Sequence, residues 1–181
     1  MKLLFATHNP NKVREFKEIL KGVAEVEQLN EEYPEIQADT SEEVAAESVK
    51  KSAEKHGKTI IVEDSGLFID ALKGFPGVYS APIHRQIGLR GILKLMEGVS
   101  ARGATYKSAV GYCEPGKKPL VFLGEEKGTI ANAIRGTHGF GHDPIFIPGG
   151  SEKTYGEMAD AAFKKQFRRR ALLKLISHLK K

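Results

Sequence analysis

The sequence predicts an α/β protein with an elongated mixed β-sheet flanked by helices. Strand-like and helix-like segments alternate in the N-terminal half, whereas the later part contains consecutive strands joined by a tight turn. Alternation favours parallel strands with helices on both faces, and consecutive strands favour antiparallel pairing. The 181 residues are long enough for one good-sized core, so we expect a single two-lobed domain over residues 1–181.

The first elements have readable boundaries. Residues 2–8 (KLLFATH) form an apolar strand, after which Asn9 is a good helix N-cap and Pro10 a good first helical residue. The apolar residues that follow recur at helical spacing, at Val13, Phe16, Ile19 and Leu20. Residues 24–29 (AEVEQL) alternate as a second strand.

A second helix is bounded by its own caps. Thr40 and Glu43 can form a capping box that opens this helix, which we expect to reach about His56 and to stop at Gly57. Residues 60–69 (IIVEDSGLFI) are the third strand.

The remaining elements complete the mixed sheet. Helix signals return at residues 88–97. Residues 104–113 and 120–126 read as strands joined by a hairpin turn, and residues 128–134 (GTIANAI) continue this antiparallel part. Residues 163–181 combine an apolar stripe with many basic residues, which predicts a C-terminal helix.

Composition excludes several classes of protein. No apolar run approaches the roughly 20 residues needed to cross a membrane, and the N-terminus lacks a signal-peptide layout. The single cysteine, Cys113, excludes an intramolecular disulfide and a cysteine-based zinc cage. We therefore expect a cytoplasmic protein without a membrane partner. The net charge of +5 leaves open whether the basic C-terminus binds nucleic acid, collects a polyphosphate or is a solvated helix face.

Two adjacent carboxylates, Glu63 and Asp64, follow the apolar start of the third strand. Burying an unpaired charge is costly, so carboxylates at such a place often meet a metal, a cation or a reaction. The alternative is that the strand leaves the core here and reaches water.

The segment ATHNPNKVRE joins a strand, a polar turn and a helix N-terminus. The free N–H groups and dipole of such a helix end can cradle phosphate, with hydrogen bonds from Thr7 and Asn9. Lys12 in the first turn opposes the dipole, which indicates a resident anion. A merely well-capped helix is the alternative.

A glycine-rich loop spans residues 136–148 (GTHGFGHDPIFIP). An aromatic ring held on such a turn, here Phe140, can stack on a planar ligand, and a nearby carboxylate, Asp143, can read the N–H edge of that ligand. The alternative is a glycine loop whose phenylalanine packs into the core.

Five motifs occur in order over nearly the whole chain: THNPNKVRE, YPEIQ, VEDSGLFIDALKGFPGVYSA, GTHGFGHDPIFIP and KTYGEM. Together they resemble the inosine triphosphate pyrophosphatase family, also called Ham1-like, whose fold is related to that of the Maf-like proteins. The resemblance implies a nucleotide cleft between two lobes, and a homodimer. It also implies Mg²⁺-dependent hydrolysis of ITP, dITP and XTP to the monophosphate and pyrophosphate.

The resemblance also implies roles for individual residues. Glu35 and Asp64 are expected to bind metal, and Asp64 to act on the attacking water. Glu63 is a second catalytic candidate, as a metal ligand, a water-orienting base or a partner of other site residues. The implied substrate-binding residues are Thr7, His8, Asn9, Pro10, Asn11, Lys12, Ser65, Phe140, Gly141, His142 and Asp143.

One part of the family pattern is missing. Members usually carry a Ser-His-Arg sequence that helps recognise the purine, whereas this chain reads KKQFRRR. Arginine can still donate to the purine or to phosphate, so Lys164, Arg169 and Arg170 are further substrate-binding candidates. The alternative is an exposed basic face of the helix.

We therefore expect an enzyme whose substrate is a nucleoside triphosphate. Two other functions remain possible on the sequence: a Maf-like pyrophosphatase for other modified nucleotides, and a non-enzymatic nucleotide or nucleic-acid-binding protein. The basic residues gather at one end and no RNA-binding signature is present, so no stable nucleic-acid partner is expected.

Overall fold

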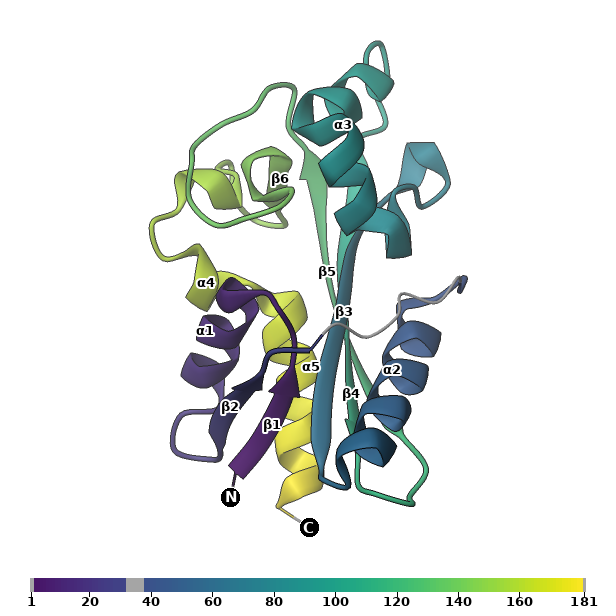
Figure 1. Ribbon diagram of the computed structural model, residues 1–181. Helices are drawn as coiled ribbons and strands as arrows, with labels where there is room; N and C mark the ends of the chain where they lie inside the picture. Colours follow the sequence, from purple (N-terminus) through teal and green to yellow (C-terminus); the bar gives the residue numbers. More distant parts are fainter. Residues whose placement is uncertain (1, 32–37, 181) are drawn as a thin grey trace. The chain divides into compact units, whose positions relative to one another are not determined.

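The computed structural model describes residues 2–31 and 38–180 and shows a mixed α/β fold, as the sequence predicts (Figure 1). The strands are β1 (Lys2–Ala6), β2 (Glu25–Leu29), β3 (Ile60–Ile69), β4 (Gly103–Cys113), β5 (Leu120–Ile130) and β6 (Phe146–Pro148). The helices are α1 (Pro10–Ile19), α2 (Ser41–His56), α3 (Ser80–Leu95), α4 (Ala161–Lys164) and α5 (Gln166–Leu179). Among the described residues, no helix is long and apolar enough to cross a membrane.

The strands form one sheet in the order β2-β1-β3-β4-β5-β6. β1 pairs in parallel with both β2 and β3, whereas β6 pairs antiparallel with β5. The parallel pairing follows the sequence, because helices separate the first three strands.

The chain divides into two compact units. The first contains Met1–Asp64, Ser108–Gly124 and Phe167–Lys181, and the second contains Ser65–Lys107 and Glu125–Gln166. β3 contributes its first half to one unit and its second half to the other.

The first unit has helices on both faces of its strands (Figure 1). Phe5 and Ile61 point toward α1 and α5, where they join a core with Phe16 and Leu172. The intervening strand residues point the other way and pack against Ala45, Val49 and Ala53 of α2. Side chains of a strand alternate between faces, so the apolar start of β3, residues 60–62, serves both cores.

Aromatic packing and close backbone approach organise the second unit. The ring of Phe146 contacts the rings of Tyr106 and Tyr155, with centroids 4.6 Å and 5.9 Å away. Gly66 lies so close to the carbonyl of Gly77 that an added Cβ would approach its oxygen to 2.2 Å, so a side chain at position 66 is excluded.

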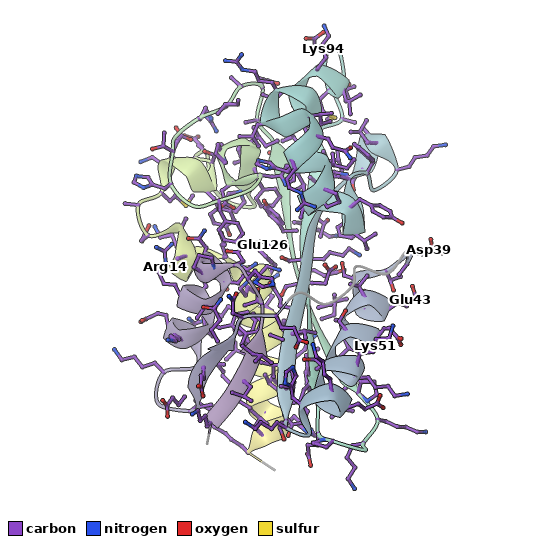
Figure 2. All side chains as sticks on the ribbon, viewed as in Figure 1. Arg14, Asp39, Glu43, Lys51, Lys94 and Glu126 are labelled. Carbon is purple, nitrogen blue, oxygen red and sulfur yellow. The ribbon has the colours of Figure 1, made fainter. Side chains whose placement is uncertain are left out.

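The caps predicted for α2 are confirmed. Thr40 Oγ1 accepts a hydrogen bond from Glu43 N, and the Glu43 carboxylate accepts one from Thr40 N at 3.2 Å. Figure 2 shows Glu43 and Asp39 together at this end of α2, where Asp39 N also donates to Glu43. At the other end Gly57 adopts the left-handed conformation with φ of 60°.

Several predicted boundaries are wrong. The first strand ends at Ala6 rather than residue 8, and α3 begins at Ser80, with a kink at Gly88. Gly128–Ile130 belongs to β5, and the rest of the GTIANAI segment is not a strand. The short β6 lies where no strand was predicted.

The third strand predicted over residues 60–69 is confirmed, and both carboxylates lie within β3. One error concerns the site. The C-terminal helix is interrupted, because Lys165 is extended, with φ −61° and ψ 98°, between α4 and α5.

Candidate active site

The turn between β1 and α1 is well ordered by its own side chains. Asn9 Oδ1 accepts hydrogen bonds from Asn11 N at 3.0 Å and from Lys12 N at 3.4 Å. Thr7 Oγ1 accepts one from Asn9 N, and the Thr7 carbonyl accepts one from Gln28. The predicted N-cap is therefore confirmed, and it already satisfies two N–H groups of the expected phosphate cradle.

The other predicted residues of this turn are fully or partly exposed to solvent. His8 is exposed and hydrogen-bonds Asn30, and Pro10, at the start of α1, is exposed too. Asn11 and Lys12 are partly buried. The turn thus presents polar groups to solvent beyond the carboxyl end of β1, where ligands of parallel sheets usually bind.

Lys12 reaches from α1 to β3. Its Nζ lies 3.0 Å from Glu63 Oε2 and donates to the Glu63 carbonyl oxygen at 2.9 Å. The Lys12 side chain remains 16% exposed, whereas that of Glu63 is fully buried. Lys12 can therefore keep its contact with Glu63 and still offer charge to an anion at the surface.

Glu63 is the centre of a buried ion network. Its Oε1 accepts hydrogen bonds from Ser108 Oγ at 2.7 Å and Arg168 Nε at 2.8 Å. Burial alone raises the pKa of Glu63, but the charges of Arg168 and Lys12, with hydrogen bonds from Arg168 and Ser108, outweigh it and lower the pKa to about 2. A carboxylate held ionised in this way is a poor proton acceptor at neutral pH.

Asp64 lies in a different environment. It is partly exposed, and as the neighbour of Glu63 along β3 its side chain points to the opposite face of the strand. The two carboxylates therefore do not converge on one ion. Of the roles open for Glu63, the geometry favours that of a partner for other site residues. Ser65 follows Asp64 and is also partly exposed.

Of the two expected metal ligands, Asp64 lies on β3 and Glu35 lies outside the described residues. Within residues 2–31 and 38–180, no three His, Cys, Asp or Glu side chains form a metal-binding group. Asp64 nevertheless suits Mg²⁺, which is usually held by one or two carboxylates together with substrate phosphates and water.

The second unit builds a compact group around Phe140. Asp143 Oδ2 accepts a hydrogen bond from Phe140 N at 2.7 Å and forms an ion pair with Lys165 Nζ at 2.8 Å. The Lys165 ammonium also lies 4.1 Å from the centre of the Phe140 ring. Asp143 and Lys165 are buried and Phe140 is partly exposed, so a planar ligand can reach the ring.

The glycines of this loop are required by its backbone. Gly139 has φ of 76°, and an added Cβ would lie 2.0 Å from Asp143 Oδ2. Gly136 has φ of 77°, and an added Cβ would lie 2.0 Å from the carbonyl oxygen of Gly156. Gly141, which also has positive φ, is partly exposed. The sequence prediction of tight glycine conformations is confirmed.

His142 is buried beside this group. Its ring meets that of His84 edge to face with centroids 5.1 Å apart, and its Nε2 has no hydrogen-bond partner among the described residues. Burial, with a contribution from His84, lowers the pKa of His142 from 6.5 to about 4. The imidazole is therefore neutral at physiological pH.

Protein stability is expected to depend on His142 in mild acid. In the unfolded chain His142 has the higher pKa of 6.5, so it takes up a proton there before it does so in the folded protein. The contribution of neutral His142 to the free energy of unfolding is therefore complete above pH 6.5 and is lost as the pH falls toward 4. The full loss amounts to about 3 kcal/mol. Urea unfolding between pH 7 and pH 4 tests this: His142→Phe should flatten the pH dependence, whereas His138→Phe, at an exposed position, should not. An equally steep dependence in His142→Phe would contradict the assignment.

The three basic candidates of the C-terminal segment are all exposed. Lys164 pairs with Asp160, the N-cap residue of α4, and Arg169 and Arg170 are exposed on α5. The buried cations are their neighbours, Lys165 and Arg168, which sequence reasoning did not select.

Glu15 was also missed. It is buried and pairs with Arg168. One signal pointed to it, since this acid lies between Val13 and Phe16 on the apolar side of α1.

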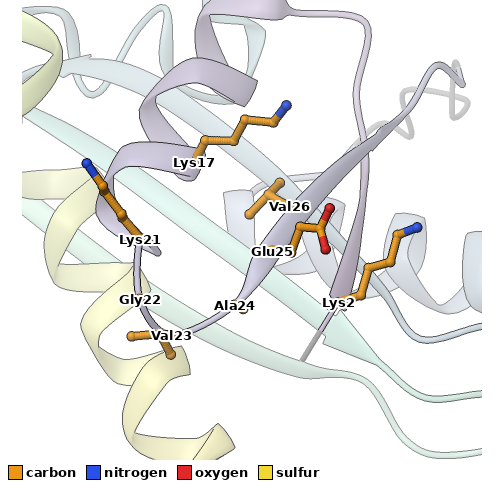
Figure 3. Close-up of a pocket in the computed structure, with 8 residues that line it drawn as sticks. All are labelled: Lys2, Lys17, Lys21, Gly22, Val23, Ala24, Glu25 and Val26. Carbon is orange, nitrogen blue, oxygen red and sulfur yellow. The ribbon is translucent and has the colours of Figure 1, made fainter.

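A shallow basin of about 780 Å³ opens elsewhere in the first unit (Figure 3). Lys2, Lys17 and Lys21 line it, together with Glu25 at the start of β2. It lies at the amino ends of β1 and β2, the opposite end from Thr7, and it contains none of the predicted site residues. It is not a candidate for the nucleotide site.

Each unit, taken by itself, offers groups that suit one part of a nucleotide. The first offers a helix N-terminus, an accessible lysine and a carboxylate, which suit a metal-bound polyphosphate. The second offers an accessible aromatic ring beside a buried ion pair, which suits a planar base. Fold and site thus define a nucleotide-binding α/β protein.

Comparison with known proteins identifies the family. The Ham1 family model matches residues 3–178, so the chain belongs to the Ham1 family. The dITP/XTP pyrophosphatase of Methanopyrus kandleri is 54% identical over 159 residues, covering 87% of this chain and 85% of that protein. The dITP/XTP pyrophosphatase of Pyrococcus horikoshii is 53% identical over the same shares. The solved Ham1 protein of Staphylococcus aureus superposes with a TM-score of 0.85 at 28% identity, covering 99% of this chain and 98% of that one.

Proposed function

We propose that this protein hydrolyses non-standard purine nucleoside triphosphates, namely ITP, dITP and XTP, to the monophosphate and pyrophosphate. The observation that carries the proposal is the pairing of Lys12 with Glu63, because it fixes an accessible ammonium group at the N-terminus of α1. The next residue along β3, Asp64, is a partly exposed carboxylate. Relatives named dITP/XTP pyrophosphatases, about half identical over most of the chain, support the same reaction.

In this proposal the first unit acts on the triphosphate. Lys12 and the N-terminus of α1 bind phosphate oxygens, and the Thr7–Asn9 hydrogen bonds keep the turn in place. Asp64 and Glu35 hold Mg²⁺, and Asp64 orients the water that attacks the α-phosphate. The metal, when bound, supplies positive charge that stabilises the leaving pyrophosphate.

The second unit acts on the base. Phe140 stacks on the purine through the face that Lys165 does not cover, and Asp143 fixes the ring through Phe140 N. A 6-oxo purine has an acceptor at O6 and a donor at N1, the reverse of adenine. A rigid site built for the first pattern rejects the second, because its buried groups would stay unpaired.

Two further features belong to the proposal. We expect the enzyme to be a homodimer, as the family resemblance implies, and to act in the cytoplasm, where its nucleotide substrates are.

Product analysis with ITP tests the proposed reaction. We expect IMP and pyrophosphate with Mg²⁺, no turnover in EDTA, and kcat/KM for ATP at least about a hundredfold lower. Resolving pyrophosphate from orthophosphate decides which phosphate is attacked. IDP and orthophosphate would place the attack at the γ-phosphate, and the lack of any nucleotide turnover would overturn the proposal.

A further inference from the structure

Arg168 has an unusual place for a residue in a basic segment. Its side chain is only 2% exposed, and it meets two glutamates from different elements. Nε donates to Glu63 Oε1 at 2.8 Å and Nη2 to Glu63 Oε2 at 3.4 Å, while Nη1 donates to Glu15. The planar guanidinium group suits this position, because its several N–H donors can hydrogen-bond to both carboxylates at once.

The network links the parts that present the phosphate-binding groups. Glu15 lies three residues after Lys12 on α1, so both side chains are on one side of that helix. Arg168 holds α1 through Glu15, and it fixes the Glu63 carboxylate to which Lys12 is bound. The charges of Lys12, Arg168, Glu15 and Glu63 sum to zero, which favours one fixed arrangement in a buried site.

We propose that Arg168 is a positioning residue for the triphosphate: it sets the place of the Lys12 ammonium through Glu63 and Glu15 and does not read the purine. The inference rests on the proposed function, which assigns Lys12 to phosphate. It also gives Arg168 a different role from Arg169 and Arg170, whose exposed side chains remain the candidates for direct substrate contact.

The test removes the arginine without leaving a buried charge unpaired. The variant Arg168→Met/Glu15→Gln loses one positive and one negative charge and keeps similar side-chain volumes. The matched control is Lys174→Met, at an exposed position of the same helix that belongs to neither the network nor the predicted site. The probe is inorganic tripolyphosphate with Mg²⁺, measured by calorimetry on the full chain, and ITP and ATP turnover are measured alongside.

We expect the double variant to bind tripolyphosphate about tenfold more weakly and to lose about a hundredfold in kcat/KM, as misplacement of a catalytic group does. The ratio of ITP to ATP turnover should stay unchanged, and Lys174→Met should bind tripolyphosphate normally. Arg168→Lys keeps the positive charge but loses the paired N–H donors of the guanidinium group. Its affinity for tripolyphosphate should therefore lie between those of the double variant and the unaltered protein. This variant keeps the test valid if the double variant does not fold.

A double-mutant cycle with Lys12→Met checks the route of the effect. If Arg168 acts through Lys12, its loss should weaken tripolyphosphate binding little further once Lys12 is gone. Additive losses, or a changed ITP-to-ATP ratio with unchanged tripolyphosphate affinity, would overturn the inference. Failure of the unaltered protein to bind tripolyphosphate would instead contradict the phosphate assignment in the proposed function.

Discussion

Asp64→Asn is expected to lower kcat for ITP about a thousandfold while the protein remains folded. Asparagine keeps the size and one oxygen of the side chain but loses the charge that holds Mg²⁺ and orients water. Asp64 is partly exposed, so the exchange creates no buried cavity. Steady-state kinetics over a Mg²⁺ titration should show the loss of turnover together with a weaker apparent affinity for the metal.

The control for this variant is Asp160→Asn. Asp160 is an exposed carboxylate paired with Lys164, and its loss should leave kcat unchanged. Circular dichroism of both variants checks the fold. Full turnover by Asp64→Asn would remove Asp64 from the mechanism and would turn attention to Glu35.

Glu63→Gln is expected to cost about 3–5 kcal/mol of stability, because it leaves buried positive charges without their shared partner. Lys12 and Arg168 both depend on this carboxylate, and glutamine cannot accept from both with full charge. Urea unfolding at neutral pH, followed by circular dichroism, measures the loss.

Glu125→Gln provides the comparison. Glu125 forms an ion pair with Lys107, but its side chain is 44% exposed, so its loss should cost less than about 1 kcal/mol. A similar small cost for Glu63→Gln would show that the buried network adds little to stability. It would also weaken the claim that Glu63 keeps Lys12 in place.

Local signals predicted the frame of the site. The Asn9 cap, the capping box of Thr40 and Glu43, and the stop at Gly57 depend on neighbouring residues, and all three are confirmed. The glycines of the Phe140 loop are likewise understood from backbone geometry alone. Features of this kind can be read from a sequence because their physics is local.

The assignment of the basic residues could not be made in the same way. One continuous C-terminal helix was assumed, but Lys165 is extended and the helix restarts at Gln166. Such a break resets which residues face inward, so the buried cations are Lys165 and Arg168 rather than the residues beside them.

The carboxylates of β3 raise a related difficulty. Glu63 is tolerated inside a ten-residue strand because Arg168, 105 residues away along the chain, compensates its charge. A partner so distant along the chain leaves no recognisable sequence pattern around β3. The sequence therefore showed that the acids need an explanation, but it did not show the cation that provides it.

The sole cysteine gives this protein a built-in reporter of structural opening. Cys113 is 1% exposed in the core beneath α2, and burial raises the pKa of its thiol, so thiol reagents have little access to the native state. Reagents can label it only when this layer opens, and the labelling rate then reports the free energy of that opening. Labelling with and without nucleotide would reveal ligand-induced stabilisation with no engineered probe and no turnover assay.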